Sequence, residues 1–476
     1  MLRKIYSESP LWLKNLFIEA FRKKGQIKFL LNKKSFINHS CLSRERILLY
    51  NKQRKYGPRP YLCYAPFTGM FFSRIGKMAP CYASYGYKSD KWPHKSIHES
   101  WFNGEFEAIR QEMKNGNLNY ACKFCKPLFD SADFGSLLPN KYEPYGIGKL
   151  QYPKIMEFEL SNRCNLECVM CDGNLSSSIR KNRDKLPPVE DNYNEKFVQE
   201  LEEFIPYLQM AEFTGGDPFL IPIYYEIWEK IEKINPKCDI LITTNANTMS
   251  ERIEKMLTTF QNLHFNISLD SLDKSNYEQI RKNAQFEKVI ANTHKFIEYC
   301  KIHKTSCNIL VCPLTINSRD FKDIIEFANR NDICVYFHTV IKPENLSLKF
   351  QSKEYLDDLT DFLNQYQAPE KTKKQKINAE NYRNLIHLLE SWKNDLLHVS
   401  DMGTALVDVD TILTNLKLKL SIDAWQKLIK LTKVLGNEID SERLLGVLQN
   451  VDYKELEHIL LNFDESEIQD MIKKYV

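Results

Sequence analysis

Strand-like and helix-like segments alternate from residue 154 to residue 343, and this alternation limits the fold more than any other feature of the sequence. Six apolar runs rich in β-branched and aromatic residues read as strands, at 154–160, 210–215, 239–245, 263–270, 308–316 and 334–341. Runs with helical spacing lie between them, at 195–208, 222–234, 250–260, 286–302 and 319–330. Strands that alternate with helices predict an α/β fold with a parallel sheet. Because the segment has no glycine-rich dinucleotide turn, six such units favour a partial (β/α)6 barrel of the TIM type.

The flanking regions differ from this segment in charge and pattern. Residues 1–57 carry 14 Lys and Arg against 3 Asp and Glu, a net charge of 14 − 3 = +11. The whole chain has a net charge of only +4, so the positive charge is concentrated in this arm. Beyond residue 350 the pattern is helical, with a Lys-rich loop near 371–376 and a small helical bundle expected over 421–476. We therefore expect four regions: a basic arm (1–57), a cysteine-containing domain (58–135), the barrel (150–345) and an all-helical C-terminal region (346–476).

The basic arm contains one amphipathic segment. Apolar residues recur at helical spacing between Leu13 and Phe21, and Arg22, Lys23, Lys24 and Lys28 follow them. Two interpretations remain open. Residues 11–34 rest on a membrane surface or an acidic partner, or the helix packs on its own domain, which is the commoner use of such a helix.

Nothing in the sequence resembles a secretory signal or a membrane span, because the first residues lack an apolar stretch and no run of 18 apolar residues occurs. The 13 cysteines are an odd number, and in a reducing compartment they are expected to be metal ligands or buried thiols rather than disulfides. These features predict a cytoplasmic protein, and we expect no nucleic-acid partner.

Three cysteines follow directly after the first predicted barrel strand. Cys164, Cys168 and Cys171 have the spacing C-x3-C-x2-C, on the loop where a barrel enzyme carries its chemistry. Three thiolates leave one iron of a 4Fe–4S cluster without a protein ligand, which is the open position that a catalytic centre needs. Taken alone, the spacing also permits zinc or coincidence.

Four of the five cysteines that precede the barrel form a second group. Cys63, Cys81, Cys122 and Cys125 supply a complete set of four thiolates. Such a set is typical of a closed site, which holds either structural zinc or a fully ligated iron–sulfur cluster. The remaining cysteines show no pairing pattern and are expected to be small buried residues, although Cys312 and His338 lie on predicted strands and are candidates to face a substrate.

Several motifs in sequence order resemble those of radical S-adenosylmethionine (radical SAM) enzymes. The cysteine motif is followed by Thr214-Gly215-Gly216-Asp217-Pro218, which is similar to the GGEP motif of that family with Asp in place of Glu. Asn245 ends the third strand, Ser268 and Asp270 end the fourth, and Arg281 closes a segment similar to one in the family. Their order at successive strand ends makes the joint resemblance specific.

The resemblance implies the roles of these residues. Cys164, Cys168 and Cys171 would hold a catalytic 4Fe–4S cluster whose open iron binds SAM. The SAM contacts it implies are Met170 at the adenine, Gly215, Gly216, Asp217 and Asn245 near the methionine group, Ser268 and Asp270 at the ribose, and Arg281 at the carboxylate. Reductive cleavage of SAM would then produce a 5′-deoxyadenosyl radical that abstracts a hydrogen atom from a substrate, with an electron donor of the flavodoxin or ferredoxin type.

The region of the four cysteines resembles the SPASM or twitch type of auxiliary-cluster domain. A Cys-x-x-Pro-Phe stretch, the segment SIHESW and a final C-x2-C carry this resemblance, which implies a second 4Fe–4S cluster. In the family this domain usually follows the barrel, whereas here it precedes it. The resemblance favours modification of a peptide or protein side chain; the alternatives are a small molecule or glycoconjugate, and a cluster-bearing protein that binds a partner without turnover.

Overall fold

The computed structural model describes residues 42–84, 89–118, 122, 124–130, 134, 137–147 and 152–401. They belong to one compact unit, Cys41–Leu397, apart from the last residues of the final helix. The amphipathic segment at 11–34 and the helical bundle expected over 421–476 lie outside the described residues, so both stay predictions. No described helix is long and apolar enough to cross a membrane.

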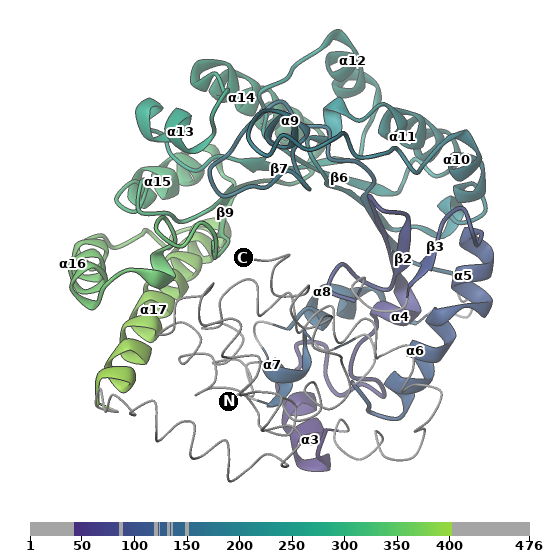
Figure 1. The fold of residues 1–476 in the computed structure, drawn as a ribbon, viewed down its shortest axis with the longest axis horizontal. Coiled ribbons are helices and arrows are strands. Elements are labelled where there is room, and N and C mark those ends of the chain that lie inside the picture. Colours follow the sequence, from purple (N-terminus) through teal and green to yellow (C-terminus); the bar gives the residue numbers. More distant parts are fainter. Residues whose placement is uncertain are drawn as a thin grey trace, which may run out of the picture. The chain divides into compact units, whose positions relative to one another are not determined.

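Six neighbouring parallel strands form the barrel part of the sheet, in their order along the chain. They are β4 (Ile155–Glu159), β5 (Met210–Phe213), β6 (Asp239–Thr244), β7 (Leu263–Ser268), β8 (Cys307–Val311) and β9 (Cys334–Phe337). The helices between them are α9 (Ser177–Asn182), α10 (Glu195–Leu201), α11 (Pro222–Ile234), α12 (Glu251–Thr259), α13 (Lys274–Ile280), α14 (Phe286–His303) and α15 (Phe321–Asn331). Figure 1 shows α10–α15 along the outer side of the curved sheet. The predicted partial (β/α)6 barrel is confirmed.

Alternation along the strands explains why one face of the sheet is covered and the other is polar. In β6 and β7 every second side chain is buried, and those of Ile240, Ile242, Phe265 and Ile267 pack with the apolar stripe of α11 and α14. The intervening positions carry Thr243, Asn266 and Ser268 among others, on the face that the helices leave free. This free face is where a substrate can meet polar groups.

The predicted last two strands are longer than the observed ones. The pattern extends over 308–316 and 334–341, whereas β8 ends at Val311 and β9 at Phe337. Pro313 explains the first difference, because proline has no N–H to donate to a sheet. The residues that follow form loops at the C-terminal ends of the strands instead.

The cysteine-containing region is continuous with the sheet of the barrel, which the sequence does not predict. Its strands are β1 (Gly69–Ser73), β2 (Lys77–Ala79) and β3 (Asp90–Lys91), and β1 pairs in parallel with β4, Gly69 opposite Ile155. In the described part of the chain the sheet therefore has nine strands, in the order β3-β2-β1-β4-β5-β6-β7-β8-β9. The helices of this region are α3 (Arg44–Gln53), α4 (Ala65–Thr68), α5 (Ile97–Asn103), α6 (Glu105–Lys114), α7 (Lys126–Asp130) and α8 (Pro139–Tyr142), with a 3-10 turn η1 (Glu143–Tyr145).

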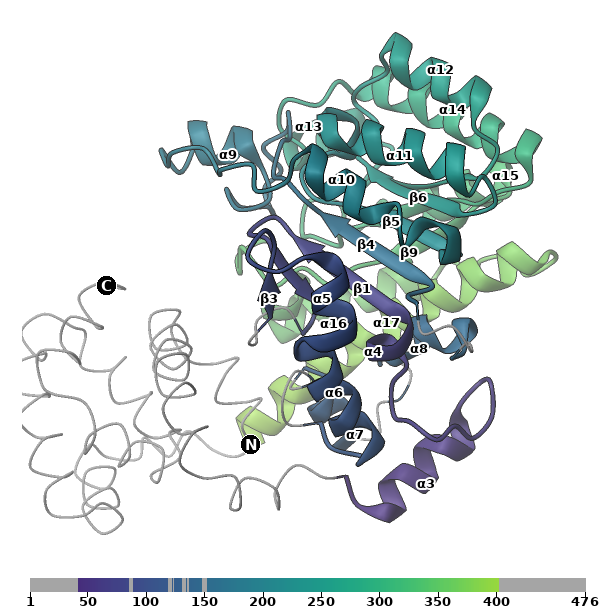
Figure 2. The same cartoon turned by 90° about the vertical axis from the view of Figure 1, so that its right-hand side faces the viewer.

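Two helices follow the barrel, α16 (Lys353–Asn364) and α17 (Lys373–Asp401), and α17 runs beside β9 (Figures 1 and 2). The prediction of a Lys-rich loop near 371–376 is wrong for three of its lysines, because Lys373, Lys374 and Lys376 lie in the first turn of α17. Thr372 begins this helix, since its hydroxyl accepts a hydrogen bond from the Gln375 N–H (3.2 Å). Short 3-10 turns complete the described elements: η2 (Ile205–Tyr207), η3 (Pro218–Leu220) and η4 (Leu348–Phe350).

Candidate active site

The three cysteines of the loop after β4 face one cavity at the C-terminal ends of the strands. The cavity has a volume of about 290 Å³. Of the predicted site residues, those that line it are Cys164, Cys168, Met170, Cys171, Gly215, Gly216, Asn245, Ser268 and Arg281. The structure thus brings together side chains from four strand ends that span more than 100 residues of sequence.

Backbone hydrogen bonds hold the cysteine loop in place. Val169 N–H donates to Ile280 O (2.9 Å) and Glu167 N–H to Lys282 O (3.0 Å), so the loop pairs with the end of α13. On the other side Cys164 N–H donates to Ser177 Oγ at the start of α9 (3.1 Å). The three thiols therefore sit on a fixed backbone, as a catalytic centre requires.

Gly215 and Gly216 allow the loop after β5 to cross the cysteine loop at close range. A Cβ on Gly215 would lie 2.5 Å from Ser161 O, and one on Gly216 would collide with Arg163 O. Gly215 also has a φ of +109°, a conformation that residues with a side chain rarely adopt. Gly216 N–H donates to Ser161 O (3.1 Å), so the glycines position the cysteine loop as well as lining the cavity.

Asp217 lies behind the cavity and not in its wall. Its side chain is buried, and its carboxylate accepts hydrogen bonds from Thr244 Oγ1 (2.8 Å), Asn245 N–H (2.9 Å) and Phe219 N–H (3.1 Å). The carboxylate therefore ties the loop after β5 to the end of β6. Its predicted contact with SAM stays a prediction, and its observed role is to position Asn245.

Asp270 and Arg281 form a buried ion pair beside the cysteines. Arg281 Nε lies 2.7 Å from Asp270 Oδ2, and both side chains are almost inaccessible to solvent. Asp270 Oδ1 also accepts from Cys312 N–H (2.7 Å), while Arg281 Nη1 lies 3.7 Å from Cys168 Sγ. Asp270 does not line the cavity, so among this pair Arg281 is the group that faces a ligand.

Asn245 and Ser268 present polar side chains to the cavity. Asn245 Nδ2 lies 3.9 Å from Cys164 Sγ and donates to Asn165 Oδ1 (3.2 Å). Ser268, at the end of β7, is partly exposed to the same space. Met170 packs with Val169 and Cys312 around buried Leu314, so it forms the apolar side of the site.

Burial keeps the three thiols protonated when no metal compensates them. It raises the pKa of Cys164 to about 11 and, together with the neighbouring Cys168, the pKa of Cys171 to about 12. Burial also raises the pKa of Cys168, although the nearby Arg281 opposes this. Thiolate ligands release protons when they bind a metal, so three convergent thiols beside one cation, one of them buried and two half-buried, suit an iron–sulfur cluster.

The second group of four cysteines also converges. Cys63, Cys81, Cys122 and Cys125 line one small apolar cavity of about 20 Å³ between α4, β2 and α7. Burial raises the pKa of the Cys63 and Cys122 thiols well above the usual range, and the neighbouring cysteines add to this. Among the described residues no three His, Cys, Asp or Glu side chains already surround a single-ion position. The geometry thus brings together the four residues that the sequence selects.

A charged network lies between the four-cysteine site and the free face of the sheet. Lys141 of α8 contacts Glu157 of β4 (2.7 Å) and Glu212 of β5 (2.6 Å), and the Tyr142 hydroxyl donates to Glu157. Sequence reasoning missed these residues. The available signal was the presence of Glu157 and Glu159 in an otherwise apolar strand, which alternation places on the face away from the helices.

The comparisons with known proteins agree with this geometry. Residues 158–328, from within β4 to within α15, match the family described as the Radical SAM superfamily. The match covers the part of the chain that carries the three cysteines and the strand ends around their cavity.

Curated relatives share only part of the chain. A probable GTP 3′,8-cyclase of Methanocaldococcus jannaschii is 27% identical over 229 residues, which cover 48% of this chain and 69% of that protein. A GTP 3′,8-cyclase of Clostridium botulinum is 27% identical over 176 residues, 37% of this chain and 49% of that protein. This chain thus spans only about half the length of the second relative.

Solved structures give partial likenesses. Streptococcus suis SuiB bound to S-adenosylmethionine has a TM-score of 0.34 and 18% identity, covering 57% of this chain and 59% of that one. The structure titled native anSMEcpe with bound AdoMet has a TM-score of 0.34 and 19% identity, covering 44% and 60%.

Proposed function

We propose that this chain is a radical SAM enzyme that holds a 4Fe–4S cluster on Cys164, Cys168 and Cys171 and binds SAM in the adjoining cavity. The observation that carries the proposal is the convergence of these three thiols, one buried and two half-buried, beside Arg281 and Asn245, on a single cavity at the strand ends. When bound, the cluster would supply the electron for reductive cleavage of SAM to a 5′-deoxyadenosyl radical, which is the species that would take hydrogen from a substrate.

The residues of the chain provide what this chemistry requires. Arg281 is suited to a carboxylate because its guanidinium donates two parallel hydrogen bonds, and Asp270 holds it in place. Gly215 and Gly216 have no side chains and so let a ligand approach the backbone, while Met170 offers an apolar surface to a nucleobase. Asp217 positions Asn245 through three hydrogen bonds and acts behind the cavity.

Anaerobic reconstitution followed by iron analysis and a 5′-deoxyadenosine assay tests the proposal. We expect about eight irons per chain, four per cubane cluster, and 5′-deoxyadenosine from SAM with dithionite. Replacement of Cys164, Cys168 and Cys171 by Ala should remove about four irons and all of the product. A control variant with Cys238, Cys300 and Cys334 changed to Ala should keep both. Product formation by the first variant contradicts the proposal.

We also propose that the second site, Cys63, Cys81, Cys122 and Cys125, holds a 4Fe–4S cluster. Changing these four residues to Ala should remove about four irons, without the loss of iron from the other site. Zinc in the purified protein with only about four irons per chain would instead identify the site as structural zinc. We expect a flavodoxin- or ferredoxin-type protein to donate the electrons. We also expect a cytoplasmic location, because a reducing compartment keeps cysteine thiols from forming disulfides.

The substrate class we favour is a peptide or protein side chain. Among the described residues that line the three-cysteine cavity the one cation, Arg281, is already paired with Asp270. The cations Lys141 and Arg74 are likewise paired with the carboxylates Glu157, Glu212 and Glu159 of the free face. A nucleoside triphosphate needs cations to balance its charge.

The relatives' names make a nucleotide such as GTP the second candidate. Faster formation of 5′-deoxyadenosine with added GTP, and not with added peptides, would select it.

A further inference from the structure

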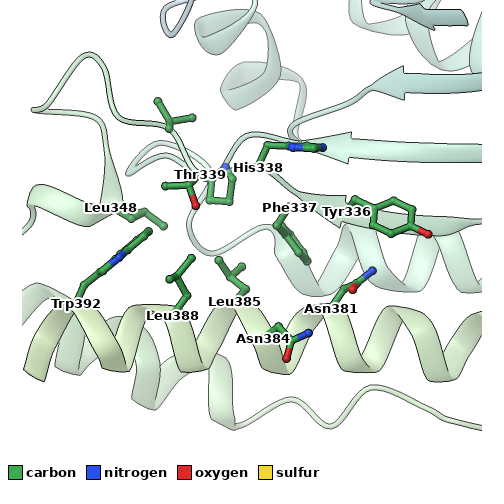
Figure 3. A pocket seen from close by; sticks show the side chains of 12 residues that line it. Tyr336, Phe337, His338, Thr339, Leu348, Asn381, Asn384, Leu385, Leu388 and Trp392 are labelled. Carbon is green, nitrogen blue, oxygen red and sulfur yellow. The ribbon is translucent and has the colours of Figure 1, made fainter. Parts of the chain in front are cut away.

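A second cavity lies between β9 and α17 (Figure 3), and all of its lining residues except Pro313 lie outside the part of the chain that matches the family. Its volume is about 230 Å³. The lining residues are Pro313, Tyr336, Phe337, His338, Thr339, Val340, Leu348, Asn381, Asn384, Leu385, Leu388 and Trp392. None of these described residues is Asp, Glu, Lys or Arg. The cavity therefore suits an uncharged ligand and offers no counter-charge to a phosphate or carboxylate.

The cavity follows the edge of the sheet. Tyr336, Phe337 and His338 all line it, although successive side chains of a strand point to opposite faces. Only a space along the edge of a strand meets three consecutive residues in this way. β9 is the last strand of the described sheet, so its outer edge has no neighbouring strand there.

Asparagine side chains of α17 already form hydrogen bonds with the backbone groups at the start of this edge. Asn378 donates to Ile333 O (3.0 Å) and accepts from Val335 N–H (2.9 Å), and Asn381 donates to Val335 O (2.7 Å). These bonds use both outward-facing backbone groups of Val335. The two side chains thus occupy the place of a neighbouring strand.

The next outward-facing residue is Phe337, because backbone groups alternate in direction along a strand and His338 N–H points inward to Val311 O (2.8 Å). Within the described residues the N–H and C=O of Phe337 have no hydrogen-bond partner. Asn384 lies three residues after Asn381 on α17, its side chain is exposed, and it lines the cavity. One backbone donor, one backbone acceptor and one carboxamide therefore meet in an uncharged space.

The cavity adjoins the three-cysteine site. Val340, which lines it, packs in one apolar cluster with Leu314, Met170 and Cys312, and Met170 lines the cavity of the three cysteines. A ligand anchored along β9 is thus held at the same end of the strands as the proposed radical chemistry. Figure 3 shows Leu385, Leu388 and Trp392 rising from α17 toward Thr339 and Leu348 as an apolar wall.

We propose that this cavity binds an uncharged, extended segment of a peptide, which adds to the edge of β9 by pairing its backbone with Phe337. This inference rests on the proposed function, whose substrate class it specifies. Main-chain hydrogen bonds supply affinity in such strand addition, and the apolar wall selects one uncharged side chain. A neutral sugar is a different class of ligand; it has no backbone to complement the N–H and C=O of Phe337.

Peptide binding to the full-length, anaerobically purified protein tests the inference. The probes are labelled, blocked hexapeptides made only of Gly, Ala, Val, Leu, Asn, Ser and Thr, measured by fluorescence anisotropy. We expect binding with a Kd of about 1 mM or tighter, and at least a tenfold loss when a central residue becomes Glu. N-methylation of one central amide should also cost at least tenfold, whereas methylation of a terminal amide should not.

Two variants of α17 localise the binding. Asn384→Trp fills the cavity from an exposed position and should weaken peptide binding at least tenfold. His387→Trp, an equally large change on an exposed part of the helix outside the cavity, should leave it unchanged. Circular dichroism confirms that both variants are folded. Equal binding by Asn384→Trp and the wild type overturns the inference, as does failure of all the peptides to bind.

Other outcomes separate this inference from the proposed function. Peptide binding should persist in the variant with Cys164, Cys168 and Cys171 changed to Ala, because β9 and α17 build the cavity. Peptide binding without 5′-deoxyadenosine formation would leave the cavity assigned and remove the radical SAM proposal. Formation of 5′-deoxyadenosine without peptide binding would support the radical SAM proposal and overturn the assignment of this cavity. Binding of maltotriose that Asn384→Trp abolishes, with no binding of peptides, would assign the cavity to a sugar and overturn the inference.

Discussion

Gly215 is required by the close approach of two loops. The cysteine loop passes so near to it that even a methyl group meets the carbonyl oxygen of Ser161. Sequence reasoning places this glycine in the site through its motif and expects it to make room for SAM. The structure adds a second reason, which depends on the tertiary crossing of two loops and is therefore not readable from spacing.

Gly215→Ala is predicted to displace the cysteine loop. The expected result is a loss of about four irons per chain and of 5′-deoxyadenosine formation, because the three thiols no longer converge on one cubane. Gly146→Ala is a matched control, since Gly146 also has a positive φ (60°) but open space around its Cβ position. Iron analysis after reconstitution measures both variants, and a full iron content in Gly215→Ala would contradict the explanation.

Arg281 and Asp270 were both predicted to touch SAM, one at the carboxylate and one at the ribose. In the structure they contact each other in a place that excludes water. Alternation along a strand indicates which face a side chain occupies, but not which of two opposite charges faces the cavity. The contact of Asp270 with the Cys312 amide is likewise a tertiary detail that one sequence does not reveal.

Arg281→Gln should destabilise the fold strongly, because it leaves the buried Asp270 carboxylate without its counter-charge. We expect a loss of about 3–5 kcal/mol in the free energy of unfolding, measured by guanidinium titration. Arg252→Gln breaks an exposed pair with Glu229 (3.0 Å) and should cost at most about 1 kcal/mol. Equal costs in the two variants would show that burial of the Arg281 pair is unimportant.

At the scale of elements, the helices and strands of the barrel were the most predictable part of the molecule. The run at 222–234 coincides with α11, since its apolar stripe is long and Pro222 starts it. The Lys-rich segment was misassigned, because lysines are common in both loops and first turns and the N-cap at Thr372 was not recognised. The role of α17 at the edge of β9 involves side chains that a hydropathy pattern scores as merely polar.

Asn378→Ala should expose this dependence of β9 on α17. The change leaves the buried Val335 N–H and Ile333 C=O without partners, so we expect a loss of about 2–4 kcal/mol in the free energy of unfolding. Hydrogen exchange at the Val335 amide should accelerate as well. Asn384→Ala, on the exposed side of the helix, should change stability by no more than about 0.5 kcal/mol. An unaltered exchange rate at Val335 would refute the role assigned to Asn378.

The N-terminal amphipathic segment yields a prediction from sequence alone. If residues 11–34 rest on a membrane surface, deletion of residues 1–30 should abolish co-sedimentation with vesicles of anionic lipid, because the Lys and Arg side chains and the apolar face are both removed. Vesicles of neutral lipid serve as the comparison, since the basic residues gain little from them. Sedimentation that is identical with and without the segment would leave only the interpretation of a helix packed on its own domain.

At the scale of the whole molecule, the two cysteine sites share one sheet. The motifs reveal each site, but not the pairing of β1 with β4 or the ion pairs of Lys141 with Glu157 and Glu212. Glu157 lies near Cys81, and the seven residue-to-residue steps from Glu157 to Cys164 span at most about 25 Å. This places the two sites within the length of one strand and its loop.

Lys141→Met should make stability depend on pH. Burial and the nearby Glu157 raise the pKa of Glu212 above 4.5, and Lys141 opposes that rise. Without the lysine, the folded state binds protons more tightly than the unfolded state. Its stability is then retained below about pH 4.5 and lost as pH increases through the raised pKa.

Guanidinium unfolding at pH 5 and pH 8 should therefore show a larger cost of Lys141→Met at pH 8. Lys295→Met, which removes a half-exposed partner of Glu254, should show no such difference. An equal cost of Lys141→Met at both pH values would mean that Glu212 is not desolvated as the structure indicates.

The pairing of β1 with β4 has a consequence for biosynthesis. Gly69 and Ile155 are neighbours in the sheet but 86 residues apart in the chain, so β1 leaves the ribosome long before its parallel partner exists. Until then β1 has only the hairpin strand β2 beside it, and its other edge is open to other chains. The order of synthesis thus makes protection of that edge, for example by a chaperone, most valuable before the barrel has been translated.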